Sequence, residues 1–219
     1  DTLRLYVFKP SAVTIGYFMS LRDSVNLPYV QKEGIPVVRR ISGGGSVLHD
    51  ELGEITYSII VKSNEVPRDP VESFKFLSGG VIEAAKILGA PAEFKPLNDG
   101  IIAQKKFSGN AQARKLGAIL QHGTFMYASD LNKLGKALRA PKEKLKAHEI
   151  TRISERVTTI SRYLGRKVSR EEALNALKEG FRKWLKVELV EGSYTPEEIE
   201  LAKSLRWKYL SKQWNELRP

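Results

Sequence analysis

The chain has 219 residues, a hydrophobic fraction of 42% and a formal net charge of +11, enough for one large folded domain or two small ones. It contains no cysteine, which excludes disulfide bonds, a thiolate nucleophile, a cysteine-ligated zinc ion and an acyl-cysteine intermediate within these residues. No apolar run approaches the length of a membrane-spanning helix and no signal peptide is visible, so we predict a cytoplasmic protein without a membrane partner.

The positive charge is concentrated in the second half of the chain. Residues 1–100 carry 11 Lys and Arg against 12 Asp and Glu, whereas residues 101–219 carry 25 against 13. A strongly basic second half predicts an acidic partner, either an acidic protein or nucleic acid. The plain alternative is a set of solvated lysines on a heat-adapted surface. No RNA-binding aromatic motif or zinc finger supports the nucleic acid.

The first half of the chain predicts strands, helices and a meander in turn. A short helix is expected over 20–33, and apolar residues at helical spacing predict a helix over 70–88 that Gly89 ends. Residues 93–126 predict an antiparallel meander that turns at 114–117. Alternating or β-branched segments predict further strands over 3–8, 12–16, 35–38, 46–48 and 54–61.

The second half is mainly helical in character. Ser169 is expected to cap a helix that runs to about Leu185, and Thr195 begins a capping box with proline at the first helical position. Three aromatic residues near the end are expected to dock on the sheet: Trp207, Tyr209 and Trp214. Strands and helices do not alternate regularly, which predicts an α/β (α+β) fold with a mixed, largely antiparallel sheet flanked by helices.

The segment from Arg39 to Asp50 is the most informative motif. Its three glycines, Gly43–Gly45, carry no β-carbon, so a ligand can lie directly on the backbone and bind its amides. Arg39 and Arg40 precede the glycines and His49 follows them, which suits an anionic ligand that carries a phosphate. The plain alternative is a glycine hairpin with surface arginines. The segment matches neither a Walker loop nor a dinucleotide fingerprint.

Two further clusters carry residue types used in nucleotide chemistry. Asp99, after Asn98, is a candidate Mg²⁺ ligand, although an Asx-turn explains the same pair. Lys106 can stabilise negative charge on a phosphate or acyl oxygen, although a strand lysine usually faces water. Lys105 is its natural control, because neighbours in a strand face opposite ways.

The histidines allow no catalytic assignment by themselves. His49 and His122 are more often hydrogen-bonded structural residues than catalytic ones, and His148 lies in a charged stretch without further signals. No spacing indicates a Ser-His-Asp triad or a glycosidase carboxylate pair.

Together these motifs resemble the lipoate–protein ligase family over nearly the whole chain. The family pattern R-R-x-S/T-G-G-G-x-V-x-H-D is matched from Arg39 to Asp50, and the patterns N-D, K-x-S-G-x-A and H-G-T follow in order. The residues that match these later patterns, with the later Arg-Val-Thr and the terminal K-Y and W-N pairs, are Asn98, Asp99, Lys106, Ser108, Gly109, Ala111, His122–Thr124, Arg156–Thr158, Lys208, Tyr209, Trp214 and Asn215.

The resemblance implies a fold shared with biotin ligases and class II aminoacyl-tRNA synthetases, and a two-step reaction. Lipoate and MgATP form lipoyl-adenylate, and a lysine of an acceptor domain then takes the lipoyl group. Lys106 would be the catalytic residue and Asp99 would reach the adenylate or its Mg²⁺. The nucleotide would be bound by Arg40, Gly44, Gly45, Ser46, Val47, Asp99 and Lys106, and the lipoate by Ser42, Gly43, His49, Ser108, Gly109 and His122.

The resemblance also implies partners. The acceptors would be acidic lipoyl domains, such as the acyltransferase subunit of 2-oxoacid dehydrogenases and the H protein of glycine cleavage. We expect residues 1–219 to form a single catalytic domain without the family's first strand and helix and without a C-terminal accessory domain, so that adenylation would need a separate small protein. Two positions depart from the family pattern: Gly100, where an apolar residue is usual, and Gln104, where glycine is common.

Two other functions stay open. An octanoyl or lipoyl transferase of the same fold would move the acyl group from a carrier protein without ATP; one branch of such enzymes uses a cysteine, which is absent here, and another uses a lysine. A non-catalytic RNA-binding or protein-binding relative is the alternative from another class, and the basic stretch 101–150 is its only support.

Overall fold

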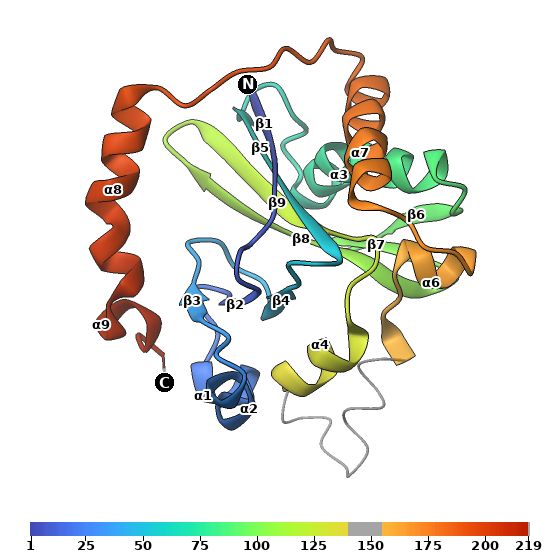
Figure 1. Cartoon of the computed structure of the whole chain (residues 1–219). Coiled ribbons are helices and arrows are strands. Elements are labelled where there is room, and N and C mark those ends of the chain that lie inside the picture. Colours follow the sequence, from blue (N-terminus) through green and yellow to red (C-terminus); the bar gives the residue numbers. More distant parts are fainter. Residues whose placement is uncertain (140–154, 219) are drawn as a thin grey trace.

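The computed structural model describes residues 1–139 and 155–218, and a six-stranded antiparallel sheet lies at its centre (Figure 1). The strand order is β1-β5-β9-β8-β7-β6, so the antiparallel meander predicted over 93–126 is confirmed. The strands are β1 (Thr2–Tyr6), β5 (Glu54–Lys62), β6 (Ala92–Lys95), β7 (Asp99–Ile102), β8 (Lys105–Lys115) and β9 (Ala118–Met126).

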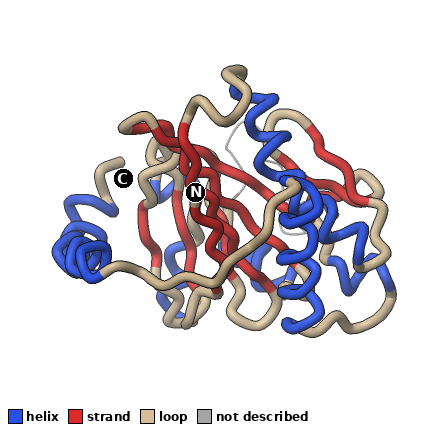
Figure 2. The backbone as a smooth tube through the Cα atoms, turned by 90° about the horizontal axis from the view of Figure 1, so that it is seen from above, coloured by secondary structure: helices blue, strands red, loops and turns tan. Residues whose placement is uncertain are grey.

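Two long helices, α3 (Pro70–Ile87) and α7 (Arg170–Leu185), cover one face of this sheet and form the main core with it (Figures 1 and 2). They cross closely, because a β-carbon at Gly180 would lie 2.4 Å from the carbonyl oxygen of Gly80. The two predicted helices, the cap at Ser169 and the capping box predicted at Thr195 are confirmed. A short helix, α6 (Ile160–Leu164), precedes α7.

The strands that flank the glycine segment form a second, three-stranded sheet in the order β3-β2-β4. Its strands are β2 (Ala12–Ile15), β3 (Val37–Arg39) and β4 (Val47–His49). Since β3 and β4 both pair with β2 and not with each other, the glycine segment is a crossing over the end of β2 and the hairpin alternative is wrong. This partition into two sheets was not predicted, because strand patterns do not reveal which strands pair.

A second, smaller core lies between this sheet and three short helices, α1 (Leu21–Ser24), α2 (Leu27–Lys32) and α4 (Leu131–Ala137). The single helix predicted over 20–33 is therefore two helices, with Asn26 as the N-cap of the second. In the described part of the chain, no helix has the length and apolar character needed to cross a membrane.

The C-terminal arm, which we define as residues 187–218, leaves α7 and passes to the opposite side of the molecule (Figures 1 and 2). It carries α8 (Pro196–Leu210) and α9 (Lys212–Asn215). No residue of α8 is buried, and Trp207 is 70% exposed. The expectation that Trp207 docks on the sheet is wrong, since its ring faces solvent. Trp214, by contrast, contacts the rings of Tyr17 and Tyr209.

Candidate active site

The glycine segment lies directly against the backbone that follows β2. The amide of Tyr17 donates a hydrogen bond of 2.9 Å to the carbonyl of Ser42. A β-carbon at Gly16 would lie 1.9 Å from the carbonyl oxygen of Gly44, and Gly44 itself has φ +86°. Glycine is therefore required on both sides of this contact, and the backbone of Gly44 and Gly45 stays exposed to a ligand.

The half-buried guanidinium of Arg40 lies under the glycine segment and holds its shape. Its Nη2 donates to the carbonyls of Gly43 at 2.6 Å and Gly45 at 2.7 Å, and its Nε donates to Ser42 Oγ at 3.2 Å. Burial lowers the pKa of Arg40 to about 10, so it stays charged at neutral pH. Among the described residues no carboxylate forms an ion pair with it. A buried cation of this kind favours a bound anion.

His122 connects the glycine segment to the central sheet. Its Nε2 lies 2.6 Å from Ser42 Oγ, and it stands opposite Ala111 in the pairing of β8 with β9. Burial lowers the pKa of His122 to about 3, with smaller contributions from the nearby Arg40 and His49. The imidazole is therefore neutral at physiological pH and acts as a hydrogen-bonding group.

His49 lies deeper than the ligand-lining position that the resemblance implies. It is buried, and its ring stacks on Phe8 at a centroid distance of 4.0 Å. Its Nε2 is 3.0 Å from Thr14 Oγ1, and its Nδ1 is 3.1 Å from both Glu54 Oε2 and Thr56 Oγ1. Both ring nitrogens are thus engaged within the protein, so His49 acts on a ligand only through its neighbours.

Lys106 and Asp99 form an ion pair of 2.6 Å between neighbouring strands β8 and β7. Gly109 makes room for it, since a β-carbon there would lie 2.6 Å from Lys106 Cε and 2.7 Å from its Nζ. Lys105 is exposed, as the alternation of side chains along a strand requires. The side chain of Lys106 is 39% exposed, which leaves it accessible to a substrate.

Two serine hydroxyls near these groups are buried and have no hydrogen-bond partner among the described residues: Ser46 Oγ and Ser108 Oγ. Native proteins rarely leave such groups unsatisfied, so both hydroxyls are available to bond a ligand or an ordered water. Gly100 packs tightly here, because a β-carbon on it would lie 3.1 Å from Ser108 Cβ. This close contact gives a physical reason for glycine at a position where the family usually has an apolar residue.

The three predicted clusters converge in space. A β-carbon on Gly44 would lie 3.7 Å from Ala111 Cβ, which brings the glycine segment onto β8. The amide of Gly109 donates to Thr124 Oγ1 at 3.2 Å, and the amide of Thr158 donates to the carbonyl of Lys106 at 2.8 Å. The later Arg-Val-Thr motif therefore lies beside the lysine. Residues 140–150 of the basic stretch, with His148, lie outside the described residues.

A metal site can be tested only at Asp99. In the ranges that the structure describes, no three His, Cys, Asp or Glu side chains cluster as metal ligands do. Asp99 can supply one carboxylate oxygen, and Mg²⁺ commonly completes its shell with phosphate oxygens and water. The donor fits a metal that arrives with a nucleotide.

Sequence reasoning missed the residues behind the site, above all Glu54, Thr14 and Asn110. Asn110 Nδ2 donates to the carbonyl of Asn98, the side-chain amide of Asn98 donates to the carbonyl of Asn110, and Asn110 Oδ1 accepts a hydrogen bond of 2.6 Å from Tyr57. Asn110 therefore holds the turn before Asp99. A signal did exist for Glu54, since a carboxylate begins the most regular apolar strand of the chain. Nothing in the sequence says what it faces.

The fold and site define a domain in which Arg40, under the glycine segment, and Lys106, on β8, give a cationic surface that suits an anion. Residues 1–182 match the family model described as the lipoyl protein ligase A/B catalytic domain, and the chain belongs to this family. The octanoyltransferase LipM of Brevibacillus brevis is 33% identical over 240 residues, which cover 98% of this chain and 86% of LipM.

Two solved structures are similar to the whole chain. A bi-partite lipoate protein ligase from Thermoplasma acidophilum, described with its E2 lipoyl domain, has a TM-score of 0.87 and 34% identity, and the match covers 98% of this chain and 83% of that one. A lipoate-protein ligase A bound with ATP has a TM-score of 0.85 and 32% identity, with coverage of 98% and 85%. The chain therefore has the lipoate ligase fold and belongs to a family of enzymes of lipoyl-group attachment.

Proposed function

We propose that the protein is an ATP-dependent lipoate–protein ligase, which forms lipoyl-AMP from lipoate and MgATP and transfers the lipoyl group to a lysine of a lipoyl domain. The observation that carries this proposal is that two cationic side chains lie beside the exposed backbone of the glycine segment. Arg40 has no carboxylate partner among the described residues, and Lys106 reaches the same region from β8. This arrangement suits an acyl-phosphate anhydride, which carries negative charge beside an uncharged acyl chain.

The two steps need no covalent intermediate on the enzyme. In the first, a carboxylate oxygen of lipoate bonds to the α-phosphorus of ATP and the bond to the β-phosphate oxygen breaks, which releases pyrophosphate. In the second, the neutral amine of the acceptor lysine bonds to the acyl carbon, the bond to the phosphate oxygen breaks, the amine nitrogen loses one proton to solvent, and AMP leaves. The absence of cysteine from these 219 residues is compatible with both steps.

The residues of the site would divide the work by position. Lys106 would stabilise charge on the acyl-phosphate oxygens in both steps, and the backbone of Gly44, Gly45 and Val47 would bind the adenylate. The unpaired hydroxyls of Ser46 and Ser108 would bind the ligand. Mg²⁺ would neutralise phosphate charge, with Asp99 as its one protein ligand.

The partner proteins follow from charge and from the relatives. The basic second half of the chain suits acidic lipoyl domains, and association with them should slow as salt is added. One similar structure is described as a bi-partite ligase, which supports the proposal that adenylation uses a separate small accessory protein. Residues 1–219 would then act as the catalytic domain of that pair.

A second candidate is an ATP-independent octanoyl transferase, which the name of the LipM relative favours. Such an enzyme would take octanoate from a carrier protein and would need a group that accepts the acyl chain. A cysteine cannot do so here, since the chain has none. Lys106 would have to serve, although its side chain forms an ion pair with Asp99.

Release of pyrophosphate separates the two functions. The purified chain, alone and with an accessory protein, is given MgATP with lipoate, octanoate or no acid, and pyrophosphate is measured. Release that depends on the acid supports the ligase. Octanoyl transfer from a carrier protein to a lipoyl domain without ATP, and no pyrophosphate under any condition, would overturn it. Lys105→Met serves as the matched control for Lys106→Met.

A further inference from the structure

Glu54 is a buried carboxylate that the steps above do not use. It begins β5, and its side chain is 1% exposed. Its Oε2 lies 3.1 Å from His49 Nδ1, and its Oε1 accepts a hydrogen bond of 2.7 Å from Thr56. In the described part of the chain no lysine or arginine pairs with it. A carboxylate buried in this way is costly, so it needs a structural or functional reason.

The bonds around Glu54 have a direction. An ionised carboxylate only accepts, so His49 donates from Nδ1. Nε2 of the neutral imidazole is then an acceptor for the hydroxyl of Thr14 at 3.0 Å. The oxygen of that hydroxyl accepts from Nη1 of Arg40 at 3.3 Å. With His49 neutral and protonated on Nδ1, every donor in this chain of contacts meets an acceptor.

The chain of contacts ends at the part of Arg40 that shapes the glycine segment. Nη1 is held by Thr14, through both its hydroxyl and its carbonyl, each at 3.3 Å. This orients Nη2 toward the carbonyls of Gly43 and Gly45. Phe8 covers His49 by stacking on it, which keeps water from competing for the imidazole.

We propose that Glu54 is a positioning residue: through His49 and Thr14 it holds Arg40 in the orientation that prepares the glycine segment for the phosphate of a nucleotide. This inference deepens the proposed function and rests on it for the identity of the anion. Glu54 itself touches no reacting atom. It acts by selecting one tautomer of His49, as carboxylates do for other histidines that serve as fixed hydrogen-bonding groups.

The first test is spectroscopic and needs no ligand. Nitrogen-15 NMR of the ligand-free protein is expected to find His49 neutral and protonated on Nδ1. Glu54→Gln keeps this tautomer, because the amide oxygen still accepts from Nδ1 while the amide nitrogen donates to Thr56. Glu54→Leu shifts His49 toward protonation on Nε2 and moves the amide resonances of Gly43–Gly45. A doubly protonated imidazole, or an Nε2 tautomer in the unaltered protein, would overturn the proposal.

The second test measures affinity for MgATP by calorimetry. We expect Glu54→Leu and Thr14→Val each to weaken binding about tenfold, and the double variant to be no weaker than the worse single one, since both break the same chain of contacts. Glu54→Gln should stay within about twofold. Thr159→Val is the matched control, because Thr159 is also a buried threonine and its hydroxyl accepts from the amide of Arg162, away from the path to Arg40.

The outcomes separate this inference from the function on which it rests. If the unaltered protein binds no nucleotide, the ligase proposal fails, while the tautomer and the glycine resonances still test the role of Glu54. If Glu54→Leu does not fold, Thr14→Val and Glu54→Gln carry the test. Nucleotide affinity that falls equally in Thr159→Val, or losses that add in the double variant, would show that Glu54 acts only through general stability.

Discussion

Arg39 and Arg40 are neighbours in the chain, yet their side chains hold two different regions of the protein, the C-terminal arm and the glycine segment. Arg39 is fully buried and donates to main-chain carbonyls on both sides of it. These carbonyls belong to Gly16, Tyr17, Met19, Trp214, Asn215 and Arg218. It clamps the end of the C-terminal arm to β3, and Trp214 returns a hydrogen bond of 2.8 Å to the carbonyl of Arg39.

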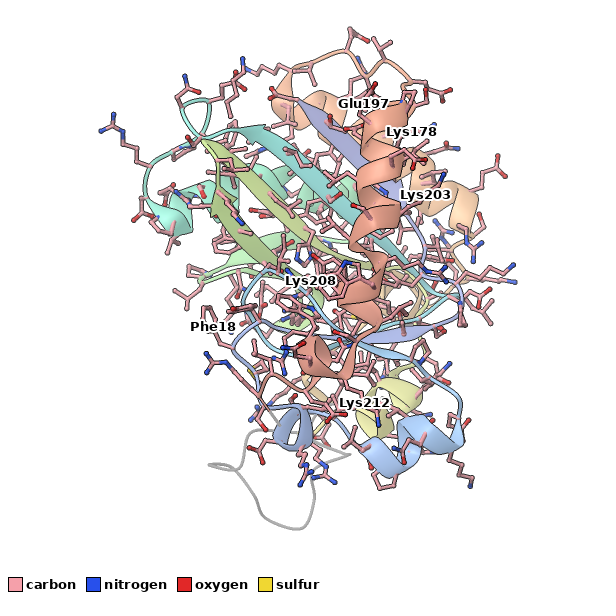
Figure 3. The ribbon with its side chains drawn as sticks, turned by 90° about the vertical axis from the view of Figure 1, so that its left-hand side faces the viewer. Phe18, Lys178, Glu197, Lys203, Lys208 and Lys212 are labelled. Carbon is pink, nitrogen blue, oxygen red and sulfur yellow. The ribbon has the colours of Figure 1, made fainter. Side chains whose placement is uncertain are left out.

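Arg40 faces the other way, toward the glycine segment, and its guanidinium donates to oxygens of Thr14, Ser42, Gly43 and Gly45. Both guanidiniums are thus bound by protein oxygens, and the difference lies in what they hold: Arg39 fixes the C-terminal arm, whereas Arg40 shapes the glycine segment. The C-terminal arm contains a contrast of its own: its end is fixed by Arg39, whereas α8 lies exposed. Figure 3 shows α8 along the outside of the molecule with Glu197, Lys203 and Lys208 on it, and no residue of that helix is buried.

The sharpest way to break the comparison is within the site, at Lys106. Lys106→Met is expected to lower the rate of lipoyl transfer by about two to three orders of magnitude, because charge on the acyl-phosphate oxygens loses its partner. Lys105→Met should change the rate by less than about twofold, since Lys105 is exposed. Circular dichroism checks that both variants fold. Equal losses would contradict the assigned facing of β8.

The clamp is tested by Arg39→Met. Removing a buried guanidinium with this many carbonyl partners should lower the free energy of unfolding by about 3 kcal/mol, measured by urea denaturation. The arm should also become a site of rapid limited proteolysis, because the carbonyls of Trp214 and Asn215 lose the hydrogen bonds that they accept from this side chain. Arg206→Met, on the exposed helix, is the control and should do neither.

Gly109→Ala separates positioning from stability. Its new methyl group would meet only the far end of the Lys106 side chain, which can move away. We expect transfer to slow by about tenfold or more while the melting temperature stays nearly unchanged. Gly192→Ala, where the methyl group meets open space, is the control. A large fall in melting temperature would show that the site cannot yield there.

His122 predicts a dependence of stability on pH. Burial holds its pKa at about 3, below the ordinary value of 6.5, so the unfolded chain binds a proton that the folded protein does not. Stability should therefore fall as pH decreases from about 6.5 toward 3, by at most about 1.4 kcal/mol per pH unit from this residue. His122→Gln should flatten that part of the profile in urea titrations. Parallel profiles would contradict the burial of a neutral imidazole.

The smallest effect is expected on the arm. Trp207→Ala should change the free energy of unfolding by no more than about 0.5 kcal/mol, because the ring is 70% exposed. Phe181→Ala, in the core between α7 and the sheet, should cost about 3 to 5 kcal/mol. Thermal denaturation compares the two. A large loss of unfolding free energy in Trp207→Ala would contradict the exposed position of this ring on α8.

Much of this protein was predictable because its signals are local. The capping residue at Ser169 and the run of alternating residues in β5 each act within a few positions of the chain, and both elements formed where expected. The motifs at Arg40, Asp99 and Lys106 also identified the family. The failure at Trp207 has the same origin, since a capping box forms a helix without saying whether anything covers it.

The sequence by itself determined the elements, the family and the residue types of the site, because propensity, capping and motif spacing depend on neighbours in the chain. Only the tertiary structure decided that Arg39 holds the C-terminal arm while its neighbour Arg40 holds the glycine segment. It also decided that His49 stands behind the site with Glu54 and that Gly109 clears space for an ammonium. These outcomes depend on distances between groups far apart in the chain, and such distances exist only once the two sheets have packed.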